Sequence, residues 1–279
     1  MTDAPSDRPR WWQWPTVLSL DAPAIAVVWQ AAIARSVGVS LSWPHVLILG
    51  ASVWLAYTAD RWIESWRLGR RPIVTARHRF HQRRRWEVLA ALVIVLGANV
   101  GTALTMLGVG DLLAGMVLAL AVLAYLLSHQ WLHRHAAWRV PKEVLVALLL
   151  SAGVWLFVRQ APADALAGPL TLFLLLCFVN CALISRWEAA VDRVQEQTSL
   201  VQSRVVARVI PWLPWLVLLV AIGLWLAGPA HHRVLSASSM VSALLLAVVD
   251  RAEPRMGWRL ARVLSDAALL TPLATFALR

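Results

Sequence analysis

Long apolar runs separated by short charged segments form the main pattern of this sequence. A helix needs about 20 residues to cross the hydrocarbon core of a bilayer, and the runs approach that length. Because lipid cannot satisfy open backbone groups, the pattern predicts an all-α polytopic membrane bundle with about nine transmembrane helices. The expected spans are residues 22–38, 44–64, 87–107, 112–131, 142–159, 168–187, 210–228, 233–250 and 258–277.

The polar connections complete the expected organisation as one integral membrane domain, residues 1–279. Three tryptophans in residues 1–16 predict an N-terminal interfacial segment. Residues 65–86 and 188–208 are expected to be a basic loop and a second loop on one side of the membrane. In the last span, Arg262 and Asp266 are four residues apart, so they could pair on a face turned from lipid.

Composition and charge support a membrane protein rather than a nucleic-acid-binding one. The chain is 59% hydrophobic and only 15% charged, with a mean hydropathy of +0.64. Its net charge of +11 is concentrated in arginine-rich connections, which suit an anionic leaflet. With nine spans, 22 of the 26 basic residues fall on one side, and this predicts a bacterial inner-membrane protein with a cytoplasmic N-terminus and an external C-terminus.

Two acidic pairs are the strongest candidates for a functional site. Asp60 and Glu64 are four residues apart, and Glu188 and Asp192 repeat that spacing. Residues four apart share a helix face, and the topology brings both pairs to the same side of the membrane. One interpretation is that they are helix-end charges balanced by neighbouring arginines. The other, which we favour, is a Mg²⁺ site that bridges to substrate phosphates, with all four acids as metal ligands and catalytic residues.

Basic residues near the acidic pairs could bind the phosphates of such a substrate. Nine arginines lie between Arg61 and Arg85, and several of them are expected only to fix the topology. Guanidinium groups also match phosphate oxygens well, so Arg61, Arg71 and Arg77 are candidate diphosphate ligands. Lys142 opens the fifth span on the same side and is a fourth candidate.

Other metal or redox chemistry has less support in the sequence. His129 and His133 have the spacing of a zinc pair on a helix, but no third ligand with matching geometry follows. Cys177 and Cys181 lie together in one apolar run, where packing explains them better than a disulfide or a metal.

These segments resemble the UbiA superfamily of intramembrane prenyltransferases. The family's first motif, NDxxDxxxD, is similar to AYTADRWIE at 56–64, and a basic loop with Arg71-Pro72 follows. Its second motif, DxxYAxxDxxDD, is similar to CALISRWEAAVD at 181–192. LSLDAPAI at 18–25 and RVPKEVLVALLLSAG at 139–153 resemble the family's entries to helices 1 and 5. Asp60, Glu64, Glu188 and Asp192 match acidic motif positions, while Ala56, Tyr57 and Cys181 stand where the family has Asn or Asp.

The resemblance implies nine helices and a specific reaction. Mg²⁺ on the acidic pairs would grip a prenyl diphosphate, and the prenyl group would pass to a lipophilic, aromatic acceptor within the membrane. Two other outcomes stay open on the same residues. A terpene cyclase would act on the donor alone, and a non-catalytic relative would bind a lipid or a partner protein.

Overall fold

The chain is all-helical throughout the part that the structure describes. This computed structural model describes residues 9–68, 75–128, 141–194 and 204–277, and no strand occurs in these ranges. The longer helices are α2 (Asp21–Ser36), α3 (Trp43–Leu68), α5 (Arg85–Met106), α6 (Val109–Leu127), α7 (Lys142–Leu156), α8 (Ala163–Val194), α10 (Leu213–Ala227), α11 (Arg233–Met256) and α12 (Trp258–Ala268). The shorter ones are η1 (Trp11–Gln13), α1 (Trp14–Val17), α4 (Ala76–Arg83), α9 (Arg204–Val209), η4 (Ile210–Trp212), η5 (Ala230–His232), η6 (Thr271–Leu273) and α13 (Ala274–Ala277).

A helix lies in each of the nine runs predicted from the sequence, but fewer qualify as membrane spans. Among the described residues, five helices are long and apolar enough to cross a bilayer, or six if the bent pair of η1–α1 and α2 counts as one span. The chain is therefore a helical membrane protein. With 15 and 11 residues, α7 and α12 are shorter than the length that a crossing requires. The nine-span arrangement stays a prediction.

Part of the predicted basic loop, residues 65–86, is helical. The last turn of α3, all of α4 and the first residues of α5 fall in this segment. The second predicted loop, 188–208, likewise contains the end of α8 and most of α9. Helical structure gives these segments fixed positions, and α4 packs against α3, α1 and α5.

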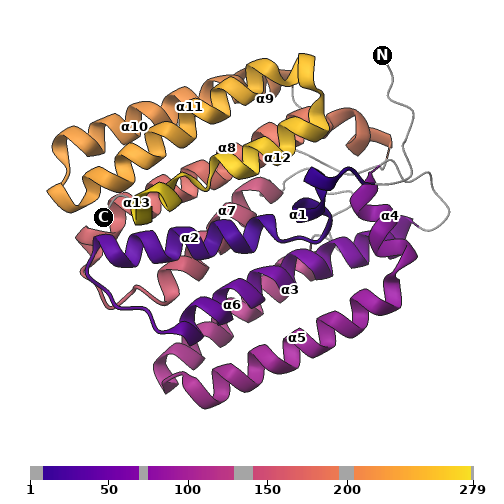
Figure 1. The fold of residues 1–279 in the computed structure, drawn as a ribbon, viewed down its shortest axis with the longest axis horizontal. Coiled ribbons are helices and arrows are strands. Elements are labelled where there is room, and N and C mark those ends of the chain that lie inside the picture. The colour runs from indigo at the N-terminus through magenta and orange to yellow at the C-terminus, as the bar shows by residue number, and fades with distance from the viewer. Residues whose placement is uncertain (1–8, 69–74, 129–140, 195–203, 278–279) are drawn as a thin grey trace.

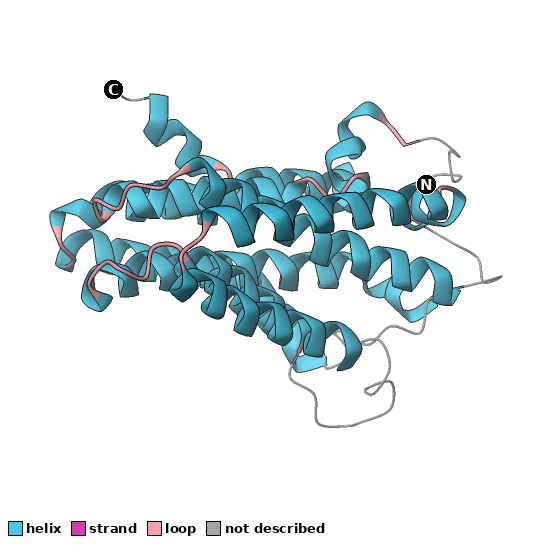
Figure 2. Cartoon of the chain, turned by 90° about the horizontal axis from the view of Figure 1, so that it is seen from below, coloured by secondary structure: helices cyan, strands magenta, loops and turns pink. Residues whose placement is uncertain are grey.

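The long helices run side by side, with α8 near the middle of the bundle (Figures 1 and 2). α8 packs against α2, α7, α10, α11 and α12, while α3 packs against α2 and α5. Trp29 and Phe173 are fully buried where α2 meets α8, with ring centroids 5.1 Å apart. Five of the helices that meet here also supply the walls of the site described below.

Two helices are covered very little by the rest of the chain. α5 and α6 form the outer edge of the bundle, and large apolar side chains such as Val93, Leu104 and Val117 are more than 60% exposed. An apolar surface of this extent would aggregate in water. In a bilayer it faces lipid tails, so the exposure agrees with the apolar composition of both helices.

The connections alternate between the two ends of the bundle. In Figure 1, α1, α4 and the α11–α12 junction lie at the right, whereas the α5–α6, α7–α8 and α10–α11 junctions lie at the left. The right-hand end is the one to which the sequence assigns most of the arginines. The structure thus places the described basic segments together at one end.

We predict that Trp29→Phe destabilises the protein. The indole Nε1–H donates to the carbonyl of Leu269 at 2.8 Å, and both groups are buried. Phe keeps the ring contact but leaves this acceptor unsatisfied, which costs about 1 to 3 kcal/mol. Thermal unfolding in detergent measures the loss. Trp212→Phe is the matched control because Trp212 is 70% exposed. Equal shifts in the two variants would contradict the prediction.

Candidate functional site

A polar pocket opens among α2, α3, α7, α8 and α12, near the end of the bundle that holds α4. Its charged lining comprises Asp21, Asp60, Arg61, Glu64, Arg77, Lys142, Glu143, Glu188, Arg262 and Asp266. Its volume is about 160 Å³. One water needs about 10–15 Å³, so the pocket has room for on the order of ten non-hydrogen atoms, which is the size of a diphosphate group.

Residues distant in the sequence converge on this pocket as the topology predicts. Asp60 and Glu64 on α3 line it together with Glu188 on α8. The candidate phosphate ligands Arg61, Arg77 and Lys142 line it too. Two other predicted residues cannot be placed: Arg71 and the side chain of Asp192 lie outside the described part of the chain. Whether the converging residues act in catalysis stays a prediction.

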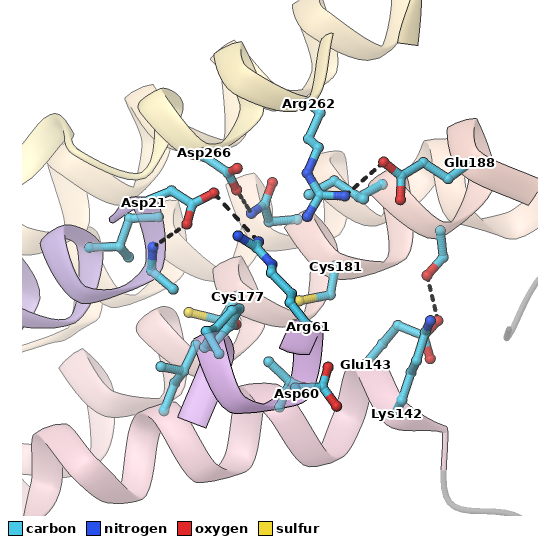
Figure 3. Close-up of a pocket in the computed structure, with 18 of the residues that line it drawn as sticks. Asp21, Asp60, Arg61, Lys142, Glu143, Cys177, Cys181, Glu188, Arg262 and Asp266 are labelled. Atoms are coloured by element: carbon cyan, nitrogen blue, oxygen red, sulfur yellow. Dashed lines mark hydrogen bonds and ion pairs between the residues drawn. The ribbon is translucent and has the colours of Figure 1, made fainter. Parts of the chain in front are cut away.

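Glu188 is held by two arginines rather than presented alone to the pocket. Arg77 on α4 donates from both terminal nitrogens to the carboxylate, at 3.0 and 3.3 Å. Arg262 on α12 donates from Nη1 at 2.7 Å (Figure 3). The carboxylate is buried, so these charge-assisted hydrogen bonds are among the strongest that a side chain can form. They tie α4, α8 and α12 together.

The sequence assigned Arg262 a different partner. Its four-residue spacing would allow an ion pair with Asp266 on the same helix. In the structure Arg262 bonds Glu188, while Asp266 accepts a hydrogen bond from Asn180 Nδ2 at 2.8 Å. Spacing along one helix could not reveal this, because the competing partners come from α8.

Glu64 also has a specific neighbour. His78 on α4 donates from Nε2 to Glu64 at 3.0 Å, and its Nδ1 accepts from the hydroxyl of Thr75 at 2.6 Å. These two contacts fix the orientation of the imidazole ring. Burial lowers the pKa of His78, although the hydrogen bond to Glu64 opposes the shift. The pair orients α4 against α3, and thereby positions Arg77.

Arg61 fixes the corner between α1 and α2. Its Nη1 donates to the carbonyl of Thr16 and, at 2.8 Å, to the hydroxyl of Ser19. Ser19 has a φ of 59°, an unusual value for a residue with a side chain, and the two helices meet at 75°. The Arg61 Nη2 also lies 4.0 Å from the Asp21 carboxylate. Much of this guanidinium is therefore engaged in structure, although Arg61 also borders the pocket.

Further polar groups line the pocket beyond those that the sequence singled out. Asp21 from α2 and Asp266 from α12 lie next to each other in Figure 3. Glu143 accepts a hydrogen bond from Ser185 at 2.5 Å. Asp21 lies in the segment that resembles the family's entry to helix 1, which is a signal that could have pointed to it. Asp266 lies inside the last predicted span, and a charged residue at that depth is itself a signal of a polar site.

The expected cage of four carboxylates around Mg²⁺ stays a prediction, because the side chain of Asp192 lies outside the described residues. No group of three or more His, Cys, Asp or Glu side chains in the described ranges is arranged to hold a metal ion. Glu188 is already neutralised by Arg77 and Arg262. Asp60 and Glu64 are still two oxygen donors one helical turn apart. Mg²⁺ often takes one or two carboxylates and completes its shell with substrate phosphates, a role this pair can fill.

The remaining histidines and cysteines can be placed in part. His129, His133 and the rest of that predicted zinc segment lie outside the described residues. The thiols of Cys177 and Cys181 both line the pocket. They add two weakly polar, polarisable groups on α8 to the lining of the pocket.

Comparisons with known proteins identify no relative. No model of a known family matches the chain, and no curated protein or solved structure matches it. The function must therefore be argued from the site itself.

We predict that the free energy of unfolding decreases as the pH is lowered from 6.5 to about 4, in part because of His81. Burial lowers the pKa of His81 to about 4, and its Nδ1–H donates to the Arg77 carbonyl at 2.9 Å. The unfolded histidine takes up its proton near 6.5, so acid favours unfolding in this window, by up to about 3 kcal/mol. Thermal unfolding at several pH values measures this dependence.

His81→Asn tests the assignment. Asparagine keeps a donor near the Arg77 carbonyl but has no titrating group, so the variant should lose stability less steeply between pH 6.5 and 4. His231→Asn is the control, because His231 is exposed. An unchanged slope in His81→Asn would show that other groups cause the acid sensitivity.

Proposed function

We propose that this chain is a UbiA-like intramembrane prenyltransferase. It binds the diphosphate head of a prenyl donor in the pocket, with the start of the prenyl tail against the apolar wall, and transfers the prenyl group to a lipophilic, aromatic acceptor. The observation that carries the proposal is one pocket, within a helical membrane bundle, in which four cationic side chains and six carboxylates, the pair Asp60 and Glu64 among them, meet an apolar wall. Such a site matches a ligand with an anionic head and a hydrocarbon tail.

The cationic side chains suit the diphosphate head. Arg77, Lys142 and Arg262 reach the pocket from three different helices. As the carbon–oxygen bond to the diphosphate breaks, negative charge accumulates on the leaving oxygens. Fixed positive groups in a site of low dielectric stabilise that charge without having to reorganise.

The apolar wall suits the prenyl tail. Ile25, Val146, Leu150 and Leu269 line the pocket together with the ring of Tyr57. An allylic cation formed here would be shielded from water, which would otherwise capture it. An aromatic face stabilises a nearby cation, and Tyr57 would supply that face at a position where the family carries Asp.

Mg²⁺ enters the proposal at Asp60 and Glu64. These carboxylates would hold the ion together with the diphosphate, and the ion would neutralise phosphate charge as the donor ionises. Glu64 is oriented by His78, whose ring is fixed in turn by Thr75. Orientation of this kind commonly tunes metal-ligating carboxylates.

The membrane placement belongs to the same proposal. The arginine-rich end of the bundle, which carries the mouth of the pocket, faces the cytoplasm of a bacterial cell, because basic connections are retained on that side. The donor diphosphate would then enter from the cytoplasm, while its tail and the acceptor come from the bilayer.

We predict that Asp60→Asn lowers prenyl transfer by a factor of about 100 to 1,000, the usual cost of losing one group that stabilises transition-state charge. Purified protein with Mg²⁺, a radiolabelled prenyl diphosphate and membrane extract as the source of acceptor gives the measurement. Asp111→Asn is the matched control, since Asp111 pairs with Arg159 outside the pocket. Equal activity in wild type and Asp60→Asn would refute the proposed role of this acid.

A second candidate is a relative that binds a prenyl diphosphate without turning it over. The contacts of Glu188 favour it, because a carboxylate neutralised by Arg77 and Arg262 is not set up to ligate a metal. Saturable donor binding without diphosphate release, in the presence of acceptor extract, would select this candidate. Products formed from donor alone would instead indicate a cyclase.

A further inference from the structure

We propose that Arg77 and Arg262 form an anion-binding pair that works without a metal ion, and that Glu188 occupies this pair until the ligand arrives. The inference rests on the proposed function, since it names the groups that take the diphosphate at the α8 side of the pocket. It assigns a binding role to Arg262, on which the family motifs are silent.

The geometry of the pair is that of an oxyanion site. Two guanidinium groups from separate elements, α4 and α12, converge on the two oxygens of one carboxylate, at 2.7 to 3.3 Å. A phosphate group presents oxygens of similar spacing and carries more negative charge. The same planar forks therefore accept either group, and the more highly charged one is favoured.

Glu188 divides one carboxylate between two guanidinium groups in a largely buried position. Asp266 and Asp21 also act electrostatically on Arg262, whereas its described hydrogen bond goes to Glu188. In addition, Nε of Arg262 is buried and has no hydrogen-bond partner among the described residues. A buried donor without an acceptor is costly, and a ligand oxygen would remove that cost.

The pair is accessible from two directions. Arg77, Glu188 and Arg262 line the main pocket and also a smaller adjoining pocket bordered by Gln13, Thr75 and Trp258. The arginine side chains are 14% and 15% exposed, whereas Glu188 is only 6% exposed. An anion can therefore reach the guanidinium groups and displace the carboxylate without unfolding any helix.

The same charges disfavour a metal ion at Glu188. A divalent cation there would lie within a few ångströms of two positive groups, and repulsion at that range is large in a site of low dielectric. Glu188 would have to leave both arginines to serve as a ligand. Its role in the unliganded protein is instead to hold Arg77 and Arg262 in the positions that the ligand needs.

Binding of inorganic diphosphate to the full-length protein in detergent tests the inference. Calorimetric titrations are compared in EDTA and in Mg²⁺ for wild type, Glu188→Gln and Arg262→Gln. Wild type should bind in EDTA, and Glu188→Gln should bind at least tenfold more tightly because the competing charge is gone. Arg262→Gln should bind at least tenfold more weakly, since a charged hydrogen bond is worth about that much.

Arg159→Gln controls for the loss of a partly buried arginine that pairs with a carboxylate. Arg159 donates to Asp111 at 2.9 Å in a pair outside the pocket, so its replacement should leave diphosphate binding unchanged. If Glu188→Gln does not fold, Arg262→Lys decides the question. Lysine keeps the charge but loses the fork, so binding in EDTA should still weaken, and unchanged binding would overturn the inference.

One result would overturn the inference and leave the proposed function intact. Diphosphate binding that requires Mg²⁺ and is lost in Glu188→Gln would make Glu188 a metal ligand. Conversely, tight binding in EDTA with no turnover of any prenyl diphosphate would support the arginine pair and contradict the transferase.

Discussion

Compensation of buried charge is the constraint on which this structure depends. Inside a helical bundle, an isolated carboxylate or guanidinium is too costly to keep, so each needs a partner. Glu188 satisfies this need through Arg77 and Arg262, and Arg61 through Thr16, Ser19 and the nearby Asp21. These contacts join α2, α3, α4, α8 and α12, so the charges that shape the pocket also hold its walls together.

Much of the fold could be predicted because the bilayer imposes a simple rule on sequence. Apolar runs of sufficient length become helices, and a helix lies in each of the nine expected runs. Helix length was harder to predict. α7 ends at Leu156 and α12 at Ala268, short of the predicted boundaries at 159 and 277, and the apolar composition of these runs does not mark those ends. The helical character of residues 76–83 was also missed, since arginines and histidines gave α4 no apolar period.

The site could be predicted in position but not in chemistry. Alternating helices brought Asp60 and Glu188 to one pocket, as the topology required. The sequence could not show which cation each acid would meet. Arg262 is 74 residues from Glu188, and the four-residue rule pointed it toward Asp266 instead. Pairing across helices depends on rotation about each helix axis, which periodicity fixes only coarsely.

The nearly uncovered helices α5 and α6 have a consequence for how this chain tolerates change. Side chains there touch fluid hydrocarbon rather than a close-packed neighbour, so exchanges such as leucine for valine leave no cavity behind. At the junction of α2 and α8, the same exchanges would leave voids. Substitutions in this protein should therefore accumulate mainly on its lipid-facing edge. There the overall hydrophobicity is preserved while the individual apolar residues vary.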